Sequence, residues 1–232
     1  VAHGFIGQHD LALENYHRAE QAYLRLGMHA ESARSRANRG VELVALGRLR
    51  EALSDLLHAE EMFNASGDVL FSAQCRGEAA KVHCQLGEFA QALELLEQAR
   101  QSLDHLGATV EADRMQLNLA TTYVEARLWV EAKTAAIAAV TSATRSGRAH
   151  DAAMGHYLAA LSDLALGHHD TAMRSVVEAE TLFTDVGDRQ YSARARLVRA
   201  EALMGIGDTR QARELLRHCA EELRQGGWII PL

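Results

Sequence analysis

Apolar side chains recur along this chain at the spacing of one face of an α-helix. The clearest stretch holds Leu49, Ala52, Leu53, Leu56, Ala59 and Phe63, and forty residues later the same positions hold Phe89, Ala92, Leu93, Leu96, Ala99 and Leu103. Steps of three and four residues place side chains on one side of a helix. The pattern therefore predicts amphipathic helices that bury one face.

Glycine marks the ends of these predicted helices at a fixed interval. One series is Gly27, Gly67, Gly107, Gly147, Gly187 and Gly227, and a second is Gly7, Gly47, Gly87, Arg127, Gly167 and Gly207. Glycine adopts the left-handed conformation at low cost and commonly ends a helix. The two series predict two helices in every 40-residue repeat. At Arg127 either the turn differs or the arginine is tolerated.

Two further features repeat with these glycines. Asp68, Asp188 and Asp208 directly follow a series glycine, where each is expected to cap the next helix. Small residues also recur at one position of the first helix of each repeat, where they allow a neighbouring helix to approach closely: Gly40, Ala80, Ala120, Ala160 and Ala200.

A repeat of this length is typical of a solenoid, in which each unit contacts its neighbours. Two units carry a small residue, a glycine seven on, a large apolar residue and two alanines, as in Gly40, Gly47, Leu49, Ala52 and Ala59, and the others keep most of this set. This pattern resembles the tetratricopeptide repeat (TPR) family over essentially the whole chain. The resemblance implies an all-α fold, a right-handed α-solenoid of antiparallel helix pairs with about five complete repeats and partial terminal units.

The predicted array is a single domain over residues 1–232. Its units lie at 1–27 (partial), 28–67, 68–107, 108–147, 148–187 and 188–227, and residues 228–232 begin a truncated next unit. The period of this chain is 40 residues, whereas an ordinary TPR has 34. The longer period is similar to that of a longer-repeat variety of TPR. Residues 117–132 also look like units that precede CHAT (caspase-like) peptidase domains in bacteria.

Composition narrows the classes of partner. The formal net charge of −7 argues against a general affinity for nucleic acid. No stretch approaches the roughly 18 apolar residues needed to span a bilayer, so no membrane is expected. The three cysteines are scattered along predicted helices. They are typical of buried residues in a reducing compartment, and we expect a cytoplasmic protein.

No residue pattern predicts catalysis, a cofactor or a metal. His168, His169 and Asp170 form the densest histidine cluster, but adjacent helical residues diverge by about 100° and do not give the spacing of a zinc site. His83 and Cys84 diverge for the same reason and do not form a nucleophile pair. The sequence contains no phosphate-binding glycine loop.

The resemblance implies a concave groove lined by the first helix of each unit, which binds a protein or peptide. Carried over position by position, its lining consists of Arg34, Asn38, Val41, Gln74, Glu78, Lys81, Arg114, Asn118, Thr121, Glu125, Met154, Tyr157, Leu158, Leu161, Arg194, Leu197, Val198 and Glu201.

Two sets of these residues suggest ligand chemistry. Asn38 and Asn118 fall where related arrays hydrogen-bond a peptide backbone, because an amide both donates and accepts; an ordinary solvated helix position explains them equally well. Arg34, Arg114 and Arg194 share one repeat position and form a row that suits an acidic ligand. Pairing of these arginines with interleaved glutamates, Glu78, Glu125 and Glu201, is the favoured interpretation.

The predicted groove changes character along the chain. It is polar from Arg34 to Glu125, whereas the later positions are mainly apolar: Met154, Tyr157, Leu158, Leu161, Leu164, Leu197 and Val198. An exposed apolar stretch usually marks an interface. We therefore expect an adjoining domain or an apolar helix on the C-terminal half.

The predicted function is a protein-binding or peptide-binding scaffold that is not an enzyme. One interpretation makes it the sensing or regulatory region of a larger bacterial protein such as a CHAT-type peptidase, and the apolar tail after Gly226 suggests that the chain continues. The alternatives are a stand-alone adaptor and the sensor array of a signal-transduction ATPase or transcription regulator. Self-association through the ends of the array is a further prediction.

Overall fold

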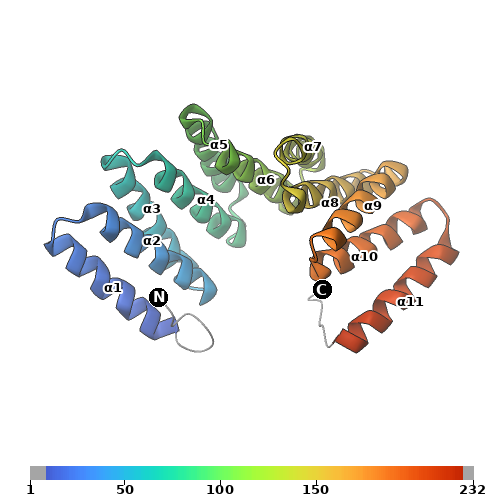
Figure 1. The fold of residues 1–232 in the computed structure, drawn as a ribbon, viewed down its shortest axis with the longest axis horizontal. Coiled ribbons are helices and arrows are strands. Elements are labelled where there is room, and N and C mark those ends of the chain that lie inside the picture. The colour runs from blue at the N-terminus through green and yellow to red at the C-terminus, as the bar shows by residue number, and fades with distance from the viewer. Residues whose placement is uncertain (1–8, 227–232) are drawn as a thin grey trace. The chain divides into compact units, whose positions relative to one another are not determined.

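The computed structural model describes residues 9–226, and all the regular structure in that range is helical. Gly7, Gly227 and the apolar tail lie outside it. The helices, labelled in Figure 1, are α1 (His9–Arg25), α2 (His29–Ala45), α3 (Leu49–Ala65), α4 (Val69–Gln85), α5 (Phe89–Leu106), α6 (Thr109–Glu125), α7 (Trp129–Arg145), α8 (Ala149–Ala165), α9 (His169–Asp185), α10 (Arg189–Gly205) and α11 (Thr209–Gly226).

Helix length is nearly constant along the chain. Each helix has 17 or 18 residues. Successive helices begin at residues 9, 29, 49 and so on to 209, so a helix pair recurs every 40 residues. None of the helices between residues 9 and 226 combines the length and apolar character needed to cross a bilayer.

The chain divides into two compact units, and the division falls within α6. The first ends at Asn118 and the second begins at Leu119. In the first unit α1 to α5 pack in sequence, and α2 also contacts α4. In the second, α7 to α11 pack in the same way and α8 contacts α10. Whether all 232 residues act as one array stays a prediction.

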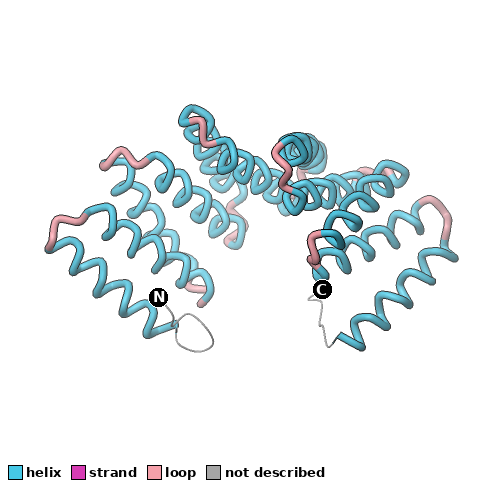
Figure 2. The backbone as a smooth tube through the Cα atoms, in the orientation of Figure 1, coloured by secondary structure: helices cyan, strands magenta, loops and turns pink. Residues whose placement is uncertain are grey.

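One turn joins the helices throughout (Figure 2). At Gly87 the backbone has a φ of +75°, the Gly87 N–H donates to the Cys84 carbonyl at 2.9 Å, and the Glu88 N–H donates to the His83 carbonyl at 2.8 Å. This pair of bonds satisfies helix carbonyls that would otherwise lack partners. A Cβ at Gly87 would meet nothing within 4 Å, so backbone conformation alone favours glycine there.

Arg127 adopts the same turn as the glycines. Its φ is 59°, its N–H donates to the Val124 carbonyl at 3.0 Å, and the Leu128 N–H donates to the Tyr123 carbonyl at 2.9 Å. Of the two interpretations that the sequence allowed, tolerance of the arginine is therefore the correct one. It is the only residue other than glycine with a positive φ in the described part of the chain.

The predicted caps and close-packing positions are confirmed. The carboxylates of Asp68 and Asp188 accept from backbone N–H groups three residues later, Phe71 at 3.2 Å and Tyr191 at 3.0 Å, and Asp208 does the same for α11. The small-residue position is buried in all five repeats. At Gly40 an added Cβ would lie 2.8 Å from Leu56 Cγ, which shows how closely α2 and α3 approach.

Buried ion pairs tie the helices together at repeating positions. Glu20 is 1% exposed and accepts from Arg36 at 2.5 Å and from Arg39 at 2.8 Å, while Arg39 also binds Asp55 through two bonds of 2.6 and 2.7 Å. The Asp55 hydrogen bonds raise the pKa of Arg39, which keeps the arginine charged. In the second unit Glu180 binds Arg196 and Arg199 in the same register.

Replacement of Arg127 by glycine is expected to stabilise the protein. A side chain in the left-handed conformation costs on the order of 1 kcal/mol, and glycine relieves most of it. Urea denaturation followed by circular dichroism should show Arg127→Gly to be about 0.5–1 kcal/mol more stable than the parent. Gly87→Ala, the matched control, should lose about 1 kcal/mol. Destabilisation by Arg127→Gly would contradict this account of the turn.

Candidate functional site

A groove of about 400 Å³ lies within the first unit, between α2, α4 and the first part of α6. Eight residues that the sequence assigned to a shared surface line it together: Arg34, Asn38, Val41, Gln74, Glu78, Lys81, Arg114 and Asn118. The 40-residue period explains this, because equivalent positions of successive first helices face the same side. Thr121 falls in the second unit and does not line this groove.

The floor of the groove is apolar and aromatic. Leu56 and Phe63 come from α3 and are each 1% exposed, and Phe71 from α4 stacks on Phe63 with ring centroids 5.3 Å apart. Met115 of α6 also lines it. A Cβ at Gly77 would lie 3.0 Å from the sulfur of Met115, so the bare glycine makes room for this side chain.

Sequence reasoning missed part of this lining. Phe71 lies three residues before Gln74, and Glu111 lies three residues before Arg114, so each shares a helix face with a predicted residue. Counting one turn back from each predicted position would have found both. Phe63 was assigned to the core, where it belongs, but it also closes the bottom of the groove.

The charges around the groove are arranged differently from the prediction. Lys81 Nζ pairs with Glu78 Oε1 at 2.7 Å, one turn away on α4. The Arg34 guanidinium lies over the Phe71 ring, 4.5 Å from its centroid. Within the described residues, neither Arg34 nor Arg114 forms an ion pair. The expected pairing of these arginines with the interleaved glutamates is therefore wrong, because Lys81 is the nearer partner of Glu78.

Cys75 lies at the floor of the same groove and is 4% exposed. Burial, with a smaller contribution from Glu60 and Glu78, raises the pKa of its thiol to about 12. A protonated, buried thiol is a weak nucleophile. Cys75 therefore contributes apolar surface to the groove.

The predicted apolar stretch of the second unit is largely core. Leu158 and Val198 are 4% and 6% exposed, so the expectation that they form an exposed interface is wrong. Tyr157 and Leu161 are half-buried and pack against the core that contains Phe183. The reason is that apolar side chains here are covered where α8 packs on α9 and α10. Burial also raises the pKa of the Tyr157 phenol.

The other predicted residues of the second unit lie at its surface. Glu201 is exposed, Thr121 is half-buried, and the half-buried Arg194 places its guanidinium 5.1 Å from the Tyr191 ring centroid. Arg194 forms no ion pair among the residues that the structure describes. It therefore resembles Arg34, which also lies over an aromatic ring.

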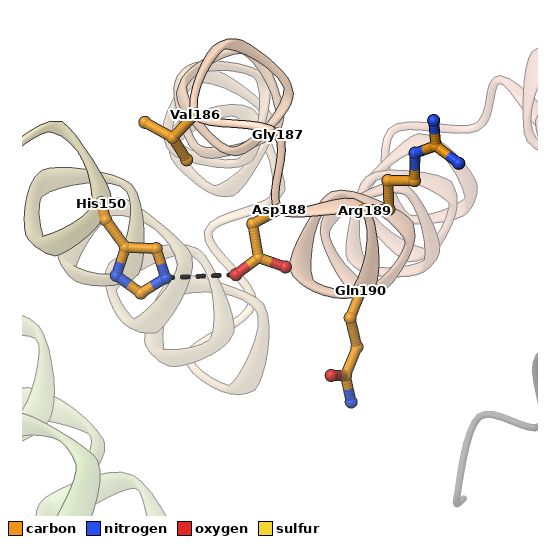
Figure 3. A pocket seen from close by; sticks show the side chains of 6 residues that line it. All are labelled: His150, Val186, Gly187, Asp188, Arg189 and Gln190. Atoms are coloured by element: carbon orange, nitrogen blue, oxygen red, sulfur yellow. Dashed lines mark hydrogen bonds and ion pairs between the residues drawn. The ribbon is translucent and has the colours of Figure 1, made fainter.

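A second hollow, of about 540 Å³, is lined by the turn between α9 and α10 and by His150 (Figure 3). The imidazole of His150 points towards the carboxylate of Asp188, 3.1 Å away. Asp188 also caps α10 through the Tyr191 N–H. Both groups are thus engaged in holding this turn.

The histidine cluster near residue 168 contributes a hydrogen-bond contact to a buried carboxylate. His168 Nδ1 lies 3.3 Å from Asp163 Oδ1, and Lys133 Nζ lies 2.6 Å from the same atom. Asp163 is 2% exposed, and Lys133 is the positively charged partner of its carboxylate. Across residues 9–226 no three histidine, cysteine or carboxylate side chains gather in a way that could hold a metal ion.

Sequence comparison finds no matching family and no matching curated protein. Several solved structures share the fold, which is that of a TPR-like α-solenoid. BtubC (BKLC) from P. vanneervenii matches with a TM-score of 0.84 and 13% identity, over 98% of this chain and 95% of that one.

Two other matches are to parts of longer chains. A Rap protein complexed with competence and sporulation factor has a TM-score of 0.68 and 16% identity, over 85% of this chain and 54% of that one. A signal transduction ATPase with numerous domains (STAND), with a tetratricopeptide repeat sensor, from Pyrococcus horikoshii, has a TM-score of 0.68 and 14% identity, over 98% of this chain and 38% of that one.

Cys75 is expected to resist alkylation while the protein is folded. A pKa of about 12 against the ordinary 9.0 lowers the thiolate fraction near neutral pH by about a thousandfold. Iodoacetamide at about pH 8 should therefore leave the Cys75 peptide unmodified in the folded protein and modify it in concentrated urea, as read by mass spectrometry. Equal rates in both conditions would show that the thiol is accessible.

Proposed function

We propose that this chain is a peptide-binding scaffold and that the groove of the first unit holds an extended peptide. The observation that carries the proposal is the gathering of Asn38, Gln74 and Asn118 along one groove with an apolar floor. Side-chain amides can donate to and accept from a peptide backbone, and the apolar floor receives side chains. The groove acts by binding, and no reaction is assigned to it.

The electrostatics of the groove favour a peptide that carries negative charge. Lys81 and Glu78 neutralise each other, which leaves Arg34, Arg114 and Glu111 among the charged groups of the lining. The groove lining therefore has a net charge of +1, whereas the whole chain has a net charge of −7. A carboxylate placed between the two arginines would gain charge-assisted hydrogen bonds.

The second unit would bind something other than the peptide held by the first unit. Its predicted residues that keep exposed atoms would contact a second partner or an adjoining domain: Thr121, Tyr157, Leu161, Arg194 and Glu201. Arg194 over Tyr191 would supply the charged part of that surface. Self-association through the ends of the array is the alternative.

We further propose that the chain is the sensing region of a larger protein. The match to the STAND protein supports this context, since this chain corresponds to 38% of a protein described as having a TPR sensor. A CHAT-type peptidase is the other candidate, which rests on the resemblance of residues 117–132, and a stand-alone adaptor is the third. The gene sequence on either side of residues 1–232 distinguishes the three.

Loss of the two asparagines should weaken peptide binding. Peptides selected from a random dodecamer display library would be labelled with fluorescein and titrated with the protein by fluorescence polarisation. Each asparagine hydrogen bond contributes about 1 kcal/mol, so Asn38→Ala with Asn118→Ala should raise the Kd by about thirtyfold. Because the loss is in backbone contacts, selected peptides of different sequence should weaken alike.

The matched control is Gln91→Ala, which removes an exposed amide of α5 outside the groove. It should leave the Kd unchanged. The proposal fails if the double asparagine variant, folded by circular dichroism, binds the selected peptides as tightly as the parent.

A further inference from the structure

The two units contain nearly identical aromatic pairs, 120 residues apart. In the first, Phe63 and Phe71 stack with centroids 5.3 Å apart and an interplanar angle of 24°. In the second, Phe183 and Tyr191 stack at 5.2 Å and 23°. Each pair joins the second helix of one repeat to the first helix of the next: α3 to α4 and α9 to α10 (Figure 1). The same structural element therefore occurs once in each unit.

An arginine covers one ring of each pair, but it comes from a different position. Arg34 reaches Phe71 from α2, whereas Arg194 lies on the same helix as Tyr191. Neither forms an ion pair in the described part of the chain. A guanidinium held on a ring keeps its N–H groups free for an anion, and the cation–π contact fixes its place.

The two pairs differ in what else lies against them. In the second unit Tyr157 packs edge-on against Phe183 and Tyr191, with centroids 6.5 and 6.0 Å away, and His150 packs edge-on at 5.7 and 6.4 Å. The rings of this pair are therefore in contact with aromatic side chains of α8.

In the first unit the positions equivalent to Tyr157 and His150 hold Ala37 and Ala30. Ala37 lines the 400 Å³ groove together with Phe63 and Phe71. The position that carries Tyr157 in the second unit thus carries a small residue that lines the groove in the first. Of these two alanines, Ala37 is the one that lines the groove.

We propose that the aromatic pair of the first unit is an anchor pocket for one apolar side chain of the bound peptide, and that Ala37 keeps it open. This inference rests on the proposed function. The ligand would be an extended peptide in which a large aliphatic or aromatic residue lies next to an aspartate or glutamate. The apolar side chain takes the place that Tyr157 fills in the second unit.

The neighbouring carboxylate follows from the charges beside the pocket. Arg34 lies directly on Phe71, so a side chain seated against that ring brings the next peptide residue close to the guanidinium. Arg114 lines the same groove and is also free of ion pairs within the described residues. A peptide with lysine beside its anchor would place a third positive charge next to these two.

The test uses fluorescein-labelled peptides selected from a random dodecamer library on the parent protein. They are expected to share an apolar residue adjacent to an acidic one. Ala37→Tyr should raise their Kd about tenfold or more, because the new ring fills the pocket. Tyr157 at the same repeat position shows that the backbone accommodates a tyrosine there. Ala90→Tyr, at an exposed position of α5 outside the groove, is the matched control and should leave the Kd unchanged.

A double-mutant cycle tests whether the apolar peptide side chain occupies the pocket beside Ala37. Replacing the apolar peptide residue by alanine should weaken binding to the parent about tenfold and should have little further effect on Ala37→Tyr. Arg34→Gln with Arg114→Gln, both exposed, should remove the preference for the acidic residue over its amide and keep the preference for the apolar one.

The outcomes separate this inference from the proposed function. If peptides bind and depend on Asn38 and Asn118 but ignore Ala37→Tyr, the anchor pocket is refuted and the peptide groove stands. Full additivity in the cycle, or selected peptides without an apolar and acidic pair, refutes it equally. If the library yields no binder to the parent, both proposals fall.

Discussion

The structure depends on a single backbone constraint, a residue in the left-handed conformation at the end of each helix. Because the same two hydrogen bonds close the turns at Gly87 and Arg127, successive helices reverse in the same way each time. Equal turns and nearly equal helices keep the repeat in register over the described chain. Register is what brings positions 40 residues apart, such as Asn38, Glu78 and Asn118, onto one face.

Close packing then converts this shared face into a groove. Gly40 lets α3 approach α2, and Gly77 admits the Met115 side chain over α4. Met115, Phe63 and Phe71 form the apolar floor of the groove, and polar side chains such as Asn38 and Asn118 line it as well. Buried acids such as Glu20 are met by arginines, which holds the first three helices together. The groove arginines Arg34 and Arg114, by contrast, form no ion pair among the described residues.

Features set by local sequence could be predicted without the structure. Helix ends and the capping role of Asp68 and Asp188 follow from short-range rules and a fixed period, whereas the repeat positions that face the groove follow from the resemblance to the TPR family. The period works because every unit repeats the same helix pair, so one unit predicts the helix bounds of the others.

Features set by packing between neighbouring helices could not be predicted in this way. Leu158 occupies the repeat position of Asn38, yet it is buried where Asn38 is exposed. The partner of Glu78 depended on which cation lay nearest, and Lys81 on the same helix was nearer than any arginine. Phe71, by contrast, could have been found from the sequence, since it reaches the groove from one turn before the predicted position of Gln74.

The most direct test of the peptide groove is a methyl NMR titration of the six methionines with a display-selected peptide. Met115 lines the groove of the first unit, whereas Met154 packs on the core of the second. The account predicts that the Met115 methyl resonance shifts and saturates with the Kd measured by fluorescence polarisation. The Met154 methyl resonance should not shift. A saturating shift of Met154 with an unmoved Met115 would place the peptide elsewhere and contradict it.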